Sequence, residues 1–93
     1  MVKKNIKTIR KKLDILDNKL LNLFKKRTSL VNDILKSKEF KNQIVDKKRI
    51  KIILKKVRAK SIKMKIDPEI TINIWKSIIR SYIKYEYKKF KKK

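Results

Sequence analysis

The stretch from residue 6 to residue 38 reads IKTIRKKLDILDNKLLNLFKKRTSLVNDILKSK, and its apolar side chains recur at steps of mostly three and four. We call this series the apolar seam; it consists of Ile6, Ile9, Leu13, Leu16, Leu20, Leu23, Leu30 and Ile34. Such spacing places the side chains on one face of an α-helix, as in a heptad repeat. The sequence therefore predicts a first helix from about residue 5 to about residue 40.

This helix is too long to be covered by a small globule. At about 1.5 Å per residue, some ~35 residues extend roughly 50 Å, whereas a compact chain of this size has a radius of gyration of about 12 to 13 Å. The whole chain has 93 residues. Its apolar seam would extend beyond its own core, and a second copy of the chain is the simplest cover. We therefore expect a homodimer.

Two shorter helices are expected after the first. Asp46 is a suitable N-cap for a helix over about residues 47–62. The run Asp67-Pro68-Glu69 combines an N-cap, a proline at the first helical position and an acid in the first turn, which predicts a third helix over about residues 68–90. No strand-like alternation persists. The fold class is all-α, with one long and two shorter helices, and residues 1–93 are expected to form a single domain.

The composition removes several kinds of chemistry. The chain contains no Cys, no His and no Gly, which excludes disulfides, thiolate and imidazole metal ligands, a histidine general base and a glycine-rich phosphate loop. We expect neither a metal nor another cofactor. No apolar run approaches the roughly 20 residues that span a membrane, and no signal-peptide core follows the basic start. A cytoplasmic protein with no membrane partner is expected.

The net charge of +23 suggests a second class of function, a basic nucleic-acid-binding helical protein. Lysine provides 26 of the 31 basic residues, a bias that an AT-rich coding sequence would also produce. No recognition-helix or RNA-binding motif is present, and the aromatic residues have the spacing of core positions. This alternative predicts an affinity that falls steeply with salt.

A few charged side chains interrupt or border the apolar helix faces. These are Arg10, Arg27, Lys38, Arg49 and Glu86. Burying an unpaired charge is costly, and in this set four cations share one carboxylate. Either the side chains reach solvent or pair with aspartates elsewhere, or an anionic ligand completes the set. Guanidinium groups suit carboxylates in particular.

Several motifs occur in an order that resembles a known family. Residues 9–27 read IRKKLDILDNKLLNLFKKR, and Lys38 follows eleven residues after Arg27. The runs VDKKR at residues 45–49 and IDPE at residues 66–69 come next, and the last helix continues from Trp75 to Glu86. In this order the motifs resemble the all-helical chorismate mutase family over nearly the whole chain.

The resemblance implies an intertwined homodimeric bundle, with active sites shared between the chains, that rearranges chorismate to prephenate in aromatic amino-acid biosynthesis. Lys38 and Glu86 would be the catalytic residues, both at the ether oxygen of the substrate. Arg10 would reach into the partner's site, and the carboxylates of the substrate would bind Arg27 and Arg49. The remaining substrate-binding positions would be Asp46, Ile50 and Tyr82.

Two positions depart from the mutase pattern. Ile50 stands where mutases commonly have Glu, and Tyr82 stands where they commonly have a small residue. Both departures resemble the isochorismate pyruvate lyase branch, which forms salicylate and pyruvate, although lyases of that branch usually have Gln at the position of Glu86. We favour the mutase reaction because its product leads to phenylalanine and tyrosine, which is the more widespread requirement. The lyase reaction is kept as the alternative.

Overall fold

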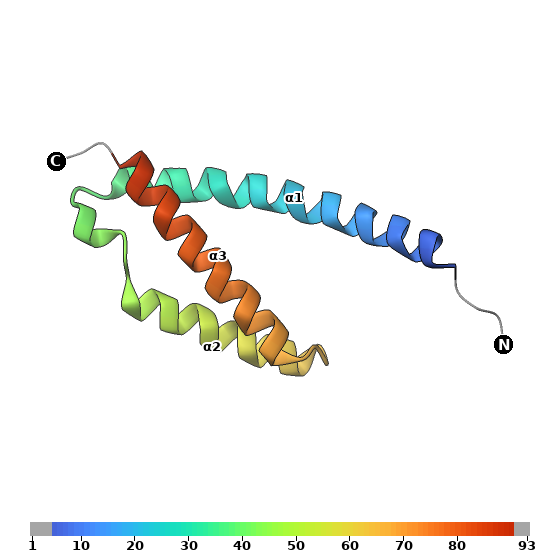
Figure 1. Cartoon of the computed structure of the whole chain (residues 1–93). Coiled ribbons are helices and arrows are strands. Elements are labelled where there is room, and N and C mark those ends of the chain that lie inside the picture. The colour runs from blue at the N-terminus through green and yellow to red at the C-terminus, as the bar shows by residue number, and fades with distance from the viewer. Residues whose placement is uncertain (1–4, 91–93) are drawn as a thin grey trace. The chain divides into compact units, whose positions relative to one another are not determined.

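The computed structural model of the chain describes residues 5–90; residues 1–4 and 91–93, the ends of the predicted domain 1–93, lie outside the described residues. Its elements are α1 (Ile6–Ser37), the 3₁₀ turn η1 (Lys41–Gln43), α2 (Lys47–Lys63) and α3 (Pro68–Lys89), as Figure 1 shows. Between residues 5 and 90 no strand occurs. The prediction of an all-helical chain with one long and two shorter helices is confirmed.

The chain divides into two compact units, Met1–Asp33 and Ile34–Lys93. In its described part, the first unit is a single helical stretch, the portion of α1 up to Asp33. The seven seam residues in this stretch, from Ile6 to Leu30, are 39% to 62% exposed. The first unit, taken by itself, thus presents an apolar face that it cannot bury, which is unusual for the surface of a monomeric protein.

In the second unit, α2 and α3 pack against each other. The N-cap of α2 is Asp46, whose Oδ1 accepts the backbone N–H of Arg49 at 3.0 Å. The N-cap of α3 is Asp67, whose Oδ1 accepts the N–H of Glu69 at 2.9 Å, with Pro68 at the first helical position. Both predicted N-caps are confirmed.

The turn between α2 and α3 closes without glycine. Lys65 takes the left-handed conformation with φ of 60°. The N–H of Ile66 donates to the carbonyl of Ser61 at 2.9 Å, and the N–H of Lys65 donates to that of Ile62 at 3.1 Å. This pair of bonds is the Schellman motif. A lysine in this conformation costs about 1–2 kcal/mol that glycine would not, because its Cβ crowds the following carbonyl.

A hydroxyl pair connects the two helices beyond this turn. The Oγ of Ser61 lies 2.6 Å from the Oγ1 of Thr71, and Ser61 also donates to the carbonyl of Val57 at 2.6 Å. Ser61 is buried, so its hydroxyl needs these partners. The pair connects the last turn of α2 to the first turn of α3.

The first helix ends three residues before the expected end at residue 40, and local hydrogen bonds explain why. The N–H of Lys38 donates to the carbonyl of Leu35, one residue nearer than an α-helical bond, at 3.2 Å. The following two N–H groups, of Glu39 and Phe40, bond to the side chain of Gln43 and not to helical carbonyls. The other helix boundaries fall within one residue of the prediction.

The buried side chains of the second unit are few. Leu35 and Ile44 are its buried apolar residues, and Ser61 and Glu86 are its buried polar ones. A buried carboxylate requires compensation, so Glu86 marks the place where this unit departs from simple packing. In the described part of the chain, no helix is both long and apolar enough to cross a bilayer.

Candidate active site

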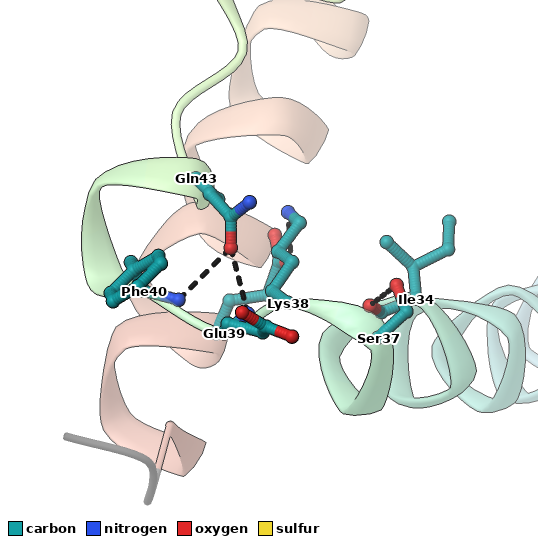
Figure 2. A network of polar contacts seen from close by, with 7 residues as sticks. Ile34, Ser37, Lys38, Glu39, Phe40 and Gln43 are labelled. Atoms are coloured by element: carbon teal, nitrogen blue, oxygen red, sulfur yellow. Dashed lines mark hydrogen bonds and ion pairs between the residues drawn. The ribbon is translucent and has the colours of Figure 1, made fainter.

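Lys38 is the first residue after α1, and the end of that helix determines where its side chain begins. The Oγ of Ser37 donates to the carbonyl of Ile34 at 2.6 Å, so the last turn is closed by a side chain (Figure 2). The shortened bond from Lys38 to Leu35 turns the chain out of the helix at the next residue. Lys38 therefore leaves the helix at a defined point.

The ammonium group of Lys38 meets the carboxylate of Glu86 on α3. Its Nζ lies 3.0 Å from Oε1, and the two side chains are 17% and 11% exposed. A charge-assisted bond of this length is among the stronger hydrogen bonds in proteins. Because both side chains are largely removed from water, salt screens this pair less than it screens a surface pair. The structure thus brings together the two residues to which the family resemblance assigns a catalytic role.

Two aromatic residues of α3 precede Glu86 within one helical turn. Tyr82 lies one helical turn before Glu86 and is partly buried. Its ring packs edge-to-face on that of Tyr85, with centroids 6.3 Å apart and planes at 83°. Lys89 places its Nζ 6.0 Å from the centroid of the Tyr85 ring. The contact with Tyr85 restrains the ring of Tyr82 on the helix that carries Glu86.

Three predicted site residues, Asp46, Arg49 and Ile50, lie at the N-terminal end of α2. Asp46 and Arg49 are exposed in the single chain, and Ile50 is partly buried. One carboxylate oxygen of Asp46 serves as the N-cap, through its bond to the N–H of Arg49. The cap fixes the first turn of α2, and this turn carries both Arg49 and Ile50.

The two other predicted arginines belong to the first unit, which is described by itself. Arg10 is exposed in the single chain, and Arg27 is partly buried. In the sequence, Arg27 falls four residues after Leu23 on the apolar seam, and Arg10 borders the seam next to Ile9. The second unit therefore contains six of the eight predicted site residues: Lys38, Asp46, Arg49, Ile50, Tyr82 and Glu86.

The Lys38–Glu86 pair has a defined chemical capacity. An ammonium carries three N–H donors, and Glu86 occupies one of them. The others can donate to oxygen atoms of an anionic ligand without any proton changing place.

Between residues 5 and 90, no group of three or more His, Cys, Asp or Glu side chains is arranged to hold a metal ion.

Comparison with known families decides what kind of chain this is. Residues 9–87 match the model of the family described as chorismate mutase type II. The chain belongs to this family. No curated protein and no solved structure matches the chain significantly.

All eight predicted site residues, from Arg10 to Glu86, fall inside the part of the chain that matches the chorismate mutase type II family. The match therefore covers both units. It concerns the family as a whole and does not distinguish the isochorismate pyruvate lyase branch, which the sequence resembles at Ile50 and Tyr82 and also in the stretches 58–59 and 74–76.

One residue near the site was not singled out from the sequence. Gln43 accepts two backbone N–H groups of the segment that follows Lys38, as Figure 2 shows. A polar side chain a few residues after the end of a helix could have suggested such a role, but glutamine in a loop is too common to be informative.

Proposed function

We propose that this protein is a chorismate mutase, which rearranges chorismate to prephenate in the cytoplasm for the synthesis of aromatic amino acids. The observation that carries the proposal is the largely buried pair formed by Lys38 and Glu86, Nζ to Oε1 3.0 Å, in a chain of the chorismate mutase type II family. The two residues lie 48 positions apart in the sequence, and the family resemblance implies a catalytic role for both.

The reaction suits a protein without Cys or His. One carbon–oxygen bond of the ether bridge breaks while a carbon–carbon bond forms within the same molecule, so no nucleophile, metal or proton transfer is needed. The protein holds the folded conformer of the substrate and stabilises the negative charge that develops on the ether oxygen. Lys38 is proposed to donate a hydrogen bond to this oxygen, and Glu86 donates a second one when its carboxyl carries a proton.

The two carboxylates of chorismate would account for the presence of arginines among the predicted site residues. A guanidinium group forms two parallel bonds with a carboxylate, so Arg27 and Arg49 are proposed to bind one end of the substrate each, with Arg10 arriving from the second chain. Ile50 and Tyr82 are proposed to flank the ring. Asp46 is proposed to adjoin the substrate while its capping bond holds the turn that presents Arg49.

The open apolar seam of α1 supports a homodimer. Seven of its side chains in the first unit are at least 39% exposed, and burying a leucine or isoleucine is favourable by about 1.5–3 kcal/mol. A second copy offers the same seam in return, as a two-fold interface requires. A single helix has no core of its own. The first unit is therefore proposed to be part of one domain, 1–93, that is completed by the partner.

Incubation of the purified protein with chorismate and, separately, with isochorismate tests the function. Prephenate from the first substrate is the expected product, identified by chromatography against a standard. If isochorismate gave salicylate and pyruvate while chorismate gave no prephenate, the protein would be an isochorismate pyruvate lyase and not a chorismate mutase. If neither substrate reacted and the protein bound nucleic acid with an affinity that falls steeply with salt, the nucleic-acid alternative would be favoured.

A further inference from the structure

The segment between α1 and α2 is organised around one side chain. The amide oxygen Oε1 of Gln43 accepts the backbone N–H of Glu39 at 2.7 Å and that of Phe40 at 2.9 Å (Figure 2). These are the two residues that follow Lys38 directly. One oxygen with two lone pairs thus accepts the two N–H groups that follow directly after the end of α1.

Backbone bonds close the same segment at its other end. The N–H of Gln43 donates to the carbonyl of Phe40 at 3.0 Å, and the N–H of Ile44 donates to that of Lys41 at 3.1 Å. Ile44 is only 3% exposed, so it anchors η1 in the core. Gln43 therefore joins the residues next to Lys38 to a turn that is itself fixed by burial.

Burial does not hold the residues next to Lys38 themselves. Glu39 is exposed and Phe40 is 56% exposed, so little apolar packing restrains this part of the backbone. Gln43 is exposed as well, and its side chain is not part of the core. Its contribution to the segment is thus the two hydrogen bonds that its amide oxygen accepts.

We propose that Gln43 is a positioning residue: it holds the backbone that carries Lys38, and so keeps the ammonium group of Lys38 against Glu86 in the geometry the reaction needs. This role rests on the function proposed above. A displacement of about 1 Å at a catalytic group can lower a rate by about 100-fold, so the loss of these two bonds should affect the chemical step more than substrate binding.

The test distinguishes the hydrogen-bond acceptor of the Gln43 side chain from the space that this side chain fills. Gln43→Leu keeps the approximate size of the side chain and removes the oxygen, whereas Gln43→Glu keeps an oxygen at the same reach. Asn42→Leu, on the neighbouring exposed position of η1, is the matched control. We expect Gln43→Leu to lower kcat by roughly tenfold with KM within about twofold, and we expect Gln43→Glu and Asn42→Leu to stay within about threefold of the wild type.

A second measurement does not depend on turnover. Amide hydrogen exchange, followed by nuclear magnetic resonance, should be roughly tenfold faster for Glu39 and Phe40 in Gln43→Leu than in the wild type, and unchanged in Asn42→Leu. Equal exchange rates in Gln43→Leu and the wild type would overturn the positioning role whatever the activity. Faster exchange together with an unchanged kcat would overturn it as well. Failure of the wild type to convert chorismate sinks the proposed function, and with it the catalytic part of this inference. The exchange rates then still decide whether Gln43 holds the segment.

Discussion

Lys38→Ala is expected to lower kcat/KM for chorismate by about 100-fold or more, because it removes the donor that we propose for the developing charge on the ether oxygen. The ammonium group lies 3.0 Å from Glu86 and is largely shielded from water, where such a donor is worth more than in bulk solvent. Steady-state kinetics of prephenate formation measure the effect. Lys41→Ala removes an exposed lysine three residues away and is expected to stay within about twofold of the wild type.

Stability and catalysis have to be separated for this variant. Lys38→Ala leaves the carboxylate of Glu86, whose side chain is 11% exposed, without the cation that faces it, and is therefore expected to lower the melting temperature. The double variant Lys38→Ala with Glu86→Gln places a neutral amide at that position and should regain most of the stability but none of the activity. A well-folded double variant with near wild-type turnover would contradict the role of Lys38.

Leu20→Lys is the second change with a large expected effect. Leu20 lies in the middle of the apolar seam and is 50% exposed in the single chain. In the proposed dimer the change buries a charge from each chain in an apolar interface, which is strongly unfavourable. We expect the mass measured by sedimentation to fall from twice that of the 11.3 kDa chain to that of one chain. Activity at micromolar protein concentrations is expected to fall to roughly a tenth or less of that of the wild type.

Asn18→Lys is the matched control for Leu20→Lys. It introduces the same side chain two residues earlier, on the opposite side of the helix, since each residue advances the helix by about 100°. This variant should remain dimeric and active. A Leu20→Lys protein that sediments and turns over like the wild type would show that the seam is not the interface.

Most of the fold could be predicted from the sequence because the signals are local. The step of three and four along α1 and the caps Asp46 and Asp67 each depend on a few neighbouring residues, and the structure has both helix starts where these caps place them. The end of α1 was placed too late, because the side chain of Gln43 takes N–H groups that a periodicity argument assigns to the helix. The turn at Lys65 gave no signal, since the residue usual there is glycine.

The candidate site could be predicted only in part, for a physical reason. Periodicity places a charged residue on a helix face, but it contains no information on which face of another helix lies opposite. The pairing of Lys38 with Glu86 depends on how the end of α1 and α3 pack, and the resemblance to a family suggested it where spacing could not. The exposure of Arg10 and Arg49 in the single chain follows if a second chain completes the site, which remains a proposal.

Mixing two inactive variants tests most directly the claim that Lys38 acts in a site completed by the partner chain. Lys38→Ala and Arg10→Ala are each expected to be nearly inactive. After exchange of chains at equal amounts, half of the dimers are mixed, and each mixed dimer has one intact site of two, so about a quarter of the wild-type activity should return. Lys38→Ala mixed with Arg49→Ala, both from the second unit, should recover nothing. If the first mixture were no more active than its two components, the shared site would be contradicted.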